Sequence, residues 1–185
     1  KKLMDLDALG CFAMTERGHG SDVQQLETTA TYDAEAQEFI INSPTASAEK
    51  WFIGKAARDG GGAAVFAQLI VPGSGASEDD LADKADTASQ SSESQGVHCL
   101  LVRIREDDGS AIDGVRIGDH GYKGGLKGVD NGTISFDNHR VPREALLNRF
   151  ADVDEAGNYT SPIENPNRRF FTMLGALVRG RVTVG

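Results

Sequence analysis

The chain has 185 residues, of which 39% are hydrophobic and 25% are charged, and its formal net charge is −9. This composition is typical of a globular domain with a core, and the acidic balance argues against a nucleic-acid partner. No apolar run approaches the length that a membrane-spanning helix needs, so no membrane partner is expected either.

Short strand-like runs dominate the chain and are separated by glycine- and asparagine-containing turns. They lie at residues 11–15, 28–32, 39–42, 51–53, 63–71, 97–104, 115–117 and 133–136. Strands of this length and spacing predict a mainly β fold, an antiparallel β-barrel or a sandwich. The runs at 63–71 and 97–104 are apolar on both faces, so we expect them to be central.

Residues 73–95 form an acidic stretch between these two runs. The stretch holds six acidic residues and one lysine, and Leu81 is its only large apolar residue. Such a segment has too little to bury, so we expect a disordered insert rather than a functional acidic tail.

Helical signals appear only late in the chain. Pro142 predicts the first turn of a short helix that continues to Phe150. From Arg168 onward, apolar residues recur at helical spacing and predict an amphipathic helix. We therefore expect a β domain over residues 1–165 and the beginning of a helical domain over residues 166–185. The chain starts without Met and ends within a helical pattern, which suggests a piece of a longer protein.

Cysteines and histidines give no sign of a metal site. Cys11 and Cys99 lie far apart and outside any CxxC pattern, so we expect two reduced, buried thiols. The four histidines lack metal-ligand spacing, and we expect them at turns or on the surface. They are His19, His98, His120 and His139.

The stretch CFAMTERGHGSD, residues 11–22, joins a strand end to a glycine-rich turn. Gly18 and Gly20 begin a dinucleotide fingerprint, but position 23 is valine and a strand rather than a helix is expected next. Ser21 lacks the Gly-x-Ser-x-Gly context of a nucleophile. A dinucleotide phosphate site and a serine nucleophile are therefore not predicted here.

A flat ligand suits this turn better. Small residues between two strands allow close approach to main-chain N–H groups, and Thr15 adds a hydroxyl donor at the strand end. A flavin presents N5 and the carbonyl oxygens of its pyrimidine edge as acceptors. The turn alone is a weak signal for a flavin.

Six segments read together resemble the acyl-CoA oxidase family. They are residues 11–22, 26–33, 38–44, 50–54, 125–132 and 140–149, the fourth of which reads KWFIG. Their order and spacing agree over nearly the whole chain apart from the acidic insert. The resemblance implies the fold of the acyl-CoA dehydrogenase and oxidase superfamily, of which this chain would be the central β-barrel domain and the start of the next helix.

The resemblance also implies an activity for the whole enzyme. Such an enzyme oxidises a fatty acyl-CoA to the trans-2-enoyl-CoA in fatty acid β-oxidation, with FAD as the hydride acceptor. O2 then reoxidises FAD and gives hydrogen peroxide. A homodimer is implied, peroxisomal in a eukaryote or cytoplasmic in a bacterium.

Five residues carry over as site residues by the same resemblance. Thr15 and Gly54 are expected to contact FAD, and Trp51 is expected either to pack near the flavin or to be a core aromatic residue. Gly20 and Ser21 are expected near the acyl-CoA substrate.

No catalytic residue is expected within this chain. In the family, the catalytic carboxylate comes from a helical domain that this chain lacks, so Glu16 should be structural. Phe52 is a departure, because family members often carry a second tryptophan at that position.

Two alternative functions stay open. An acyl-CoA dehydrogenase that passes electrons to an electron-transfer flavoprotein usually has Thr-Glu-Pro followed by Gly-Ser-Asp here, so Arg17 and His19 favour the oxidase. A β-barrel binding module without redox chemistry is the other alternative.

Overall fold

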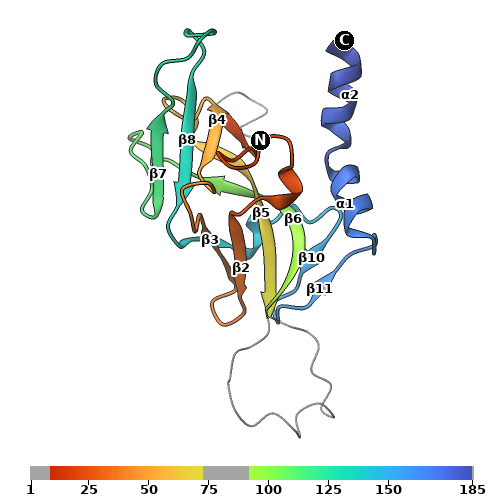
Figure 1. Ribbon diagram of the computed structural model, residues 1–185. Helices are drawn as coiled ribbons and strands as arrows, with labels where there is room; N and C mark the ends of the chain where they lie inside the picture. The colour runs from red at the N-terminus through yellow and green to blue at the C-terminus, as the bar shows by residue number, and fades with distance from the viewer. Residues whose placement is uncertain (1–8, 73–91, 185) are drawn as a thin grey trace, which may run out of the picture.

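The computed structural model describes residues 9–72 and 92–184, and within them strands predominate (Figure 1). The strands are β1 (Gly10–Ala13), β2 (Thr29–Asp33), β3 (Glu38–Asn42), β4 (Lys50–Gly54), β5 (Gly62–Pro72), β6 (Ser92–Arg103), β7 (Val115–Asp119), β8 (Asn131–Phe136), β9 (His139–Pro142), β10 (Asp152–Val153) and β11 (Tyr159–Thr160). Two helices follow, α1 (Pro166–Met173) and α2 (Gly175–Val184).

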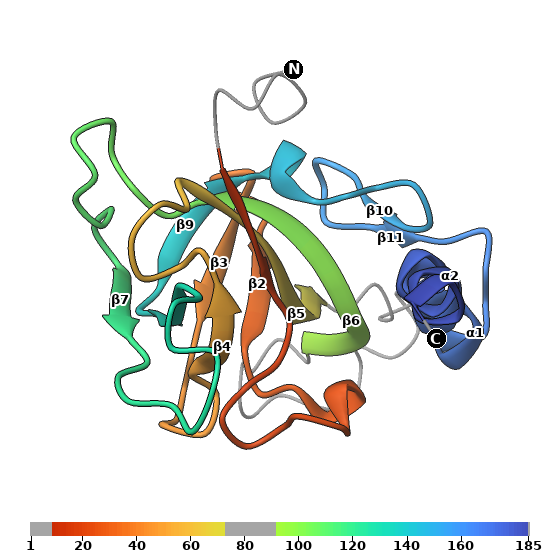
Figure 2. The same ribbon diagram turned by 90° about the horizontal axis from the view of Figure 1, so that it is seen from above.

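The strands form one large sheet and two smaller ones. The large sheet has the order β1-β5-β2-β3-β9, and β6 pairs with the other edge of β5. A second sheet has the order β4-β8-β7, and β10 pairs with β11. Seen from above, the large sheet curls, with β4 and β7 to one side of it and the helices to the other (Figure 2).

The mainly β architecture expected from the strand spacing is confirmed. β5 is central, as predicted, since β1 and β2 pair with one edge and β6 with the other. The pairings of β5 with β1 and β2 are parallel, whereas an antiparallel barrel was expected. β6 is not central. One of its edges pairs with β5, and among the described residues its other edge forms a single β-bridge, between Leu100 and Leu146.

The helix predicted over residues 142–150 is wrong. Pro142 ends β9, which is paired with β3, and residues 143–145 form one 3₁₀ turn. The chain then runs beside β6, where Leu147 N donates to the Cys99 carbonyl at 2.9 Å. Pairing with the sheet on both sides of the turn leaves no room for a longer helix.

The amphipathic helix expected from Arg168 is confirmed, but it begins at Pro166 and divides at Leu174 into α1 and α2. Asn165 caps α1, because its side chain accepts a hydrogen bond from Arg168 N at 3.1 Å. A short 3₁₀ turn, residues 23–25, precedes β2 where only a strand was expected.

The core fills the space between the large sheet and the β4-β8-β7 sheet. β2 and β3 alternate buried and partly buried residues, which is the pattern of strands with one face on a core. β5 is buried on both faces, because Val65 joins the main core while Phe66 belongs to a second cluster that also contains Phe170 of α1. Cys11 and Cys99 are both buried and free, as expected.

Most of the acidic stretch lies outside the described residues, namely residues 73–91. Its last residues, 92–95, belong to β6, so the strand starts earlier than the sequence suggested. No helix within the described ranges is long and apolar enough to cross a bilayer.

Candidate functional site

Main-chain hydrogen bonds hold the glycine-rich turn against β4. Trp51 N donates to the Thr15 carbonyl at 3.0 Å, and Arg17 N donates to the Glu49 carbonyl at 2.9 Å. The turn and the start of β4 therefore form one ribbon, and the predicted cofactor residues Thr15 and Trp51 lie side by side.

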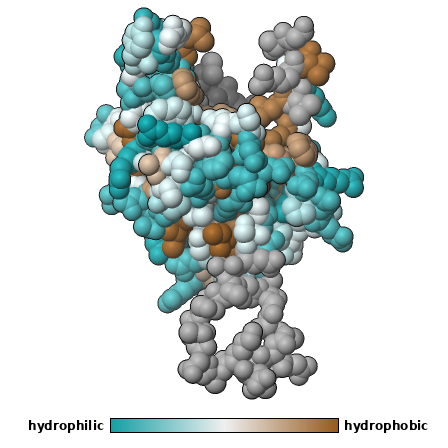
Figure 3. Space-filling model, viewed as in Figure 1, coloured by the Kyte–Doolittle hydropathy of each residue, from teal (hydrophilic) through white to brown (hydrophobic). Residues whose placement is uncertain are grey.

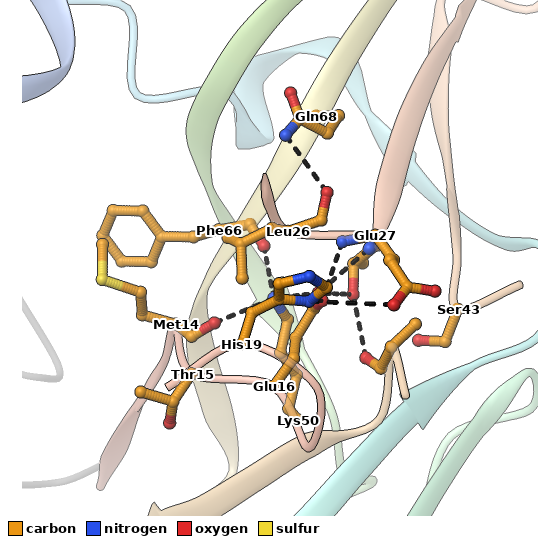
Figure 4. A network of polar contacts seen from close by, with 12 residues as sticks. Met14, Thr15, Glu16, His19, Leu26, Glu27, Ser43, Lys50, Phe66 and Gln68 are labelled. Atoms are coloured by element: carbon orange, nitrogen blue, oxygen red, sulfur yellow. Dashed lines mark hydrogen bonds and ion pairs between the residues drawn. The ribbon is translucent and has the colours of Figure 1, made fainter. Parts of the chain in front are cut away.

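A buried ion pair between Lys50 and Glu16 lies at the centre of this ribbon (Figure 4). The distance from Lys50 Nζ to Glu16 Oε1 is 3.0 Å, and both side chains are 0% exposed. Nζ also donates to the carbonyls of Met14, at 3.1 Å, and Phe66, at 2.6 Å, so each ammonium proton has an acceptor. Burial lowers the pKa of Lys50 to about 8, although the Glu16 carboxylate acts to raise this pKa.

Glu16 also binds the segment that leads into β2. Its carboxylate accepts from Glu27 N at 2.7 Å, Thr28 N at 3.0 Å and Thr28 Oγ1 at 2.6 Å. Burial alone would raise the pKa of Glu16, but Lys50 and these hydrogen bonds outweigh it and hold the pKa below its usual value. A buried carboxylate engaged in this way supports the structural role expected for Glu16.

The outer side of the turn is ordered by a second acidic side chain, Glu27. His19 Nδ1 lies 3.4 Å from a Glu16 carboxylate oxygen and 3.7 Å from one of Glu27. The Thr45 hydroxyl donates to Glu27, and this hydrogen bond lowers the pKa of Glu27. The turn is thus held by side chains of β4 and of the segment before β2, and Thr45 in turn holds Glu27.

The Thr15 hydroxyl was expected to donate a hydrogen bond to a ligand, but its proton is used within the chain. Thr15 Oγ1 donates to the Trp51 carbonyl at 2.9 Å. A hydroxyl has one proton, so a ligand beside Thr15 meets lone pairs unless this hydrogen bond breaks.

Trp51 is half-buried and belongs to neither of the two buried core clusters. The guanidinium carbon of Arg17 lies 4.5 Å from the centre of its ring, and the His120 ring centroid is 4.8 Å away. Of the two places expected for Trp51, this arrangement favours the wall of a site over the core.

Gly54 ends β4 and is exposed. A Cβ built on Gly54 would meet no heavy atom of the described residues within 4 Å. The chain therefore leaves open space beside the main chain at this position, which is what a flat ligand in close contact with the backbone requires.

Gly20 and Ser21, the expected substrate residues, lie on the exposed tip of the turn. A Cβ on Gly20 would also meet open space. Among the described residues, no hydrogen bond joins either residue to Thr15, Trp51 or Gly54. The structure thus brings Thr15, Trp51 and Gly54 onto one ribbon and leaves Gly20 and Ser21 at its end.

Sequence reasoning missed His120 as a neighbour of these residues. Its ring stacks on Phe52 with a centroid distance of 3.8 Å and an interplanar angle of 29°. Strand register explains the approach: His120 N donates to the Asn131 carbonyl, and Asn131 pairs with Gly54 across the β8–β4 ladder. No local pattern around His120 indicates such a contact.

Two other histidines are buried, contrary to the expectation of turn or surface positions. His98 is 4% exposed and His139 is 9% exposed. The His98 ring nitrogens lie 3.0 Å from the Gly96 carbonyl and 3.0 Å from the Tyr159 hydroxyl, and burial lowers the pKa of His98 to about 4. This pair joins β6 to β11 and lies apart from the turn.

Apolar side chains also remain on the surface. Figure 3 shows them at the end of the β7–β8 connection and along the helices, on a face that is otherwise largely hydrophilic. The exposed apolar residues there include Leu126, Phe171 and Val182. These side chains have no cover among the described residues.

Comparisons with known proteins agree with this architecture. Residues 11–139 match the family model described as acyl-CoA dehydrogenase, middle domain. The peroxisomal acyl-coenzyme A oxidase 3 of Arabidopsis thaliana is 45% identical over 184 residues, which cover 100% of this chain and 24% of that protein. This chain thus spans about a quarter of the length of the curated relatives it matches.

Solved structures show the same similarity. Acyl-CoA oxidase 1 from Yarrowia lipolytica superposes with a TM-score of 0.77 at 43% identity, over 94% of this chain and 22% of that one. A Caenorhabditis elegans acyl-CoA oxidase 2, bound with FAD, ascaroside-CoA and ATP, gives a TM-score of 0.75 at 33% identity over 92% of this chain and 23% of that one. The resemblance found in the sequence is confirmed, and the chain belongs to the acyl-CoA dehydrogenase middle-domain family.

Proposed function

We propose that this chain is the central domain of an acyl-CoA oxidase, which uses FAD to convert a fatty acyl-CoA to the trans-2-enoyl-CoA and reduces O2 to hydrogen peroxide. The similarity to acyl-CoA oxidases over nearly the whole chain supports the reaction class. The observation that carries the proposal is the ribbon that holds Thr15, Trp51 and Gly54 together, with open space beside the main chain at Gly54.

The residues present fit an isoalloxazine ring. Gly54 presents main chain without a side chain, and the half-exposed Phe52 ring beside it gives an apolar wall. The Lys50–Glu16 pair ties this wall to the glycine-rich turn. When bound, FAD supplies the hydride acceptor, and the part of this chain is to orient the ring and exclude water from one of its faces.

The substrate end of the proposed site is the tip of the turn. Gly20 and Ser21 are exposed there and would face the acyl-CoA. The catalytic carboxylate would come from outside this chain, because Glu16 is engaged in its buried ion pair. Residues 1–165 would form the β domain and residues 166–185 the start of a helical domain.

Several finer points belong to the same proposal. The names of relatives, such as the Arabidopsis oxidase, suggest a peroxisomal location. A homodimer and O2 as the electron acceptor follow from the family resemblance. A dehydrogenase that uses an electron-transfer flavoprotein is the second candidate. Arg17, which lies over the Trp51 ring, and His19 are the residues of the turn that favour the oxidase.

The test is an assay of the full-length protein that contains this chain. Purified protein should carry FAD and should release hydrogen peroxide in proportion to added acyl-CoA when O2 is present. Without O2, acyl-CoA should bleach the flavin once and then stop. Turnover that needs an electron-transfer flavoprotein and gives no peroxide would establish the dehydrogenase instead, and a protein without flavin would contradict both.

A further inference from the structure

His120 has two ring nitrogens that are shielded from solvent and have no hydrogen-bond partner among the described residues. A buried polar atom without a partner is costly, and native structures rarely keep one without a reason. Stacking alone does not account for an imidazole at this position, because a phenyl ring would stack without leaving nitrogens unpaired.

Asn131, which pairs with His120, and Asp119, which precedes it, have side chains that are hydrogen-bonded elsewhere. Asn131 Oδ1 accepts from Lys123 Nζ at 2.5 Å, and Asn131 Nδ2 lies 3.4 Å from the Phe52 carbonyl. Asp119 Oδ1 accepts from Gly121 N at 2.7 Å. Neither side chain forms a hydrogen bond to the imidazole, so a partner for His120 would have to come from a ligand or from another part of the protein.

Phe52, which covers one face of the imidazole, is itself strained. Its φ is +58°, in the left-handed region that bulky residues rarely adopt, and it lies where the β4–β8 register shifts. Its side chain is nevertheless 54% exposed. Strain of this kind concentrates at ligand sites, where binding can release it.

The His120 imidazole and the Phe52 ring both lie close to Gly54 and the open space beside it. The strand register sets His120, Asn131 and Gly54 in one row across the β4-β8-β7 sheet. A displacement of the Phe52 ring would uncover one face of the imidazole beside the main chain of Gly54.

We propose that His120 is a cofactor-binding residue of the flavin site, covered by the Phe52 ring until the cofactor enters and then hydrogen-bonded to an acceptor on it. This inference rests on the proposed function, because it takes the ligand beside Gly54 to be FAD. It assigns to Phe52 the role of a movable cover over an otherwise unsatisfied donor.

The first test measures FAD affinity by flavin fluorescence in the full-length apoprotein. His120→Phe keeps a ring to stack on Phe52 but removes both nitrogens, and it should weaken FAD binding about tenfold. His120→Gln restores a donor and should recover part of the loss. His139→Phe is the matched control, because His139 also lies near an aromatic ring, Phe136, but its Nδ1 already has the Asp113 carbonyl at 3.0 Å.

The second test measures how accessible the His120 imidazole is to a reagent, and it does not depend on catalytic turnover. Diethyl pyrocarbonate acylates unprotonated imidazole nitrogens, and peptide mass spectrometry reports the modified site. His120 should react slowly in the wild-type apoprotein and faster in Phe52→Gly, since glycine tolerates the positive φ and removes the ring. FAD should protect His120 in Phe52→Gly.

The outcomes separate this inference from the proposed function. If His120→Phe binds FAD as tightly as the wild type, or if FAD leaves the modification of His120 in Phe52→Gly unchanged, the inference is overturned while the flavin site stands. If the wild-type full-length protein holds no FAD at all, the proposed function itself fails.

Discussion

Lys50 and Glu16 meet at 3.0 Å in the interior, and this contact joins the glycine-rich turn to β4 while the Phe66 carbonyl ties the same ammonium to β5. The pair is therefore a structural link between the segments that carry Thr15 and Gly54. The stability that the pair contributes depends on both charges being present, because either one alone would be buried without a counter-charge.

Lys50→Met should destabilise the chain by about 3–5 kcal/mol, since it leaves the Glu16 carboxylate buried and unpaired. The double variant Glu16→Gln with Lys50→Met should cost less than the sum of the two single changes, because no uncompensated charge is left. Denaturant unfolding of the four proteins measures this coupling. Additive costs would show that the two groups act independently.

Acidification should destabilise the chain through His98. Burial holds the pKa of folded His98 at about 4, below its value in the unfolded chain, so the unfolded state takes up the proton first as the pH falls. The contribution of His98 to the free energy of unfolding has nearly its full value above about pH 6.5. The free energy of unfolding should decline by about 2 kcal/mol between pH 7.5 and pH 5.

Denaturant unfolding at a series of pH values measures this decline. His98→Phe keeps a ring between β6 and β11 without the titration, and its stability should vary less over the same range. An identical pH dependence in the two proteins would assign the decline to other groups.

Gly54→Val should weaken FAD binding by the full-length protein and leave the β domain folded, because the added side chain enters space that the chain itself does not use. Gly61→Val is the matched control, since a Cβ there also meets no heavy atom within 4 Å. FAD content and the far-ultraviolet circular dichroism of both variants are the measurements. Normal FAD stoichiometry in Gly54→Val would remove Gly54 from the site.

Thr15→Val should cost about 1 kcal/mol of stability, because it removes the hydrogen bond from the Thr15 hydroxyl to the Trp51 carbonyl. The loss should appear in unfolding experiments without FAD. If stability is unchanged and only FAD affinity falls, the hydroxyl serves the ligand rather than the ribbon.

The strands were predictable from sequence because their signals are local. Phe39 and Ile41 alternate with less buried neighbours in β3, and this period is visible without any knowledge of partners. The false helix after Pro142 shows the limit. Its residues are compatible with a helix, but β9 pairs with β3 and Leu147 binds the edge of β6, and neither contact has a local signature.

The candidate site was predictable only in part. Thr15, Trp51 and Gly54 came from the family resemblance, and the structure joins them through the pairing of the turn with β4. His120 could not be found, because it approaches Phe52 through the register of two intervening ladders. His98 lies in the apolar run 97–104, which already indicated burial, but its partner Tyr159 on β11 is 61 residues away and has no local signature.

The position of β5 between β1 and β2 on one edge and β6 on the other has a consequence for synthesis at the ribosome. β1 and β2 leave the ribosome before β5 does, and neither can complete its parallel pairing until β5 is present. During that interval their edges are open to association with other chains. We therefore expect nascent chains that end before β5 to depend on chaperones, and that dependence to fall once β5 has emerged.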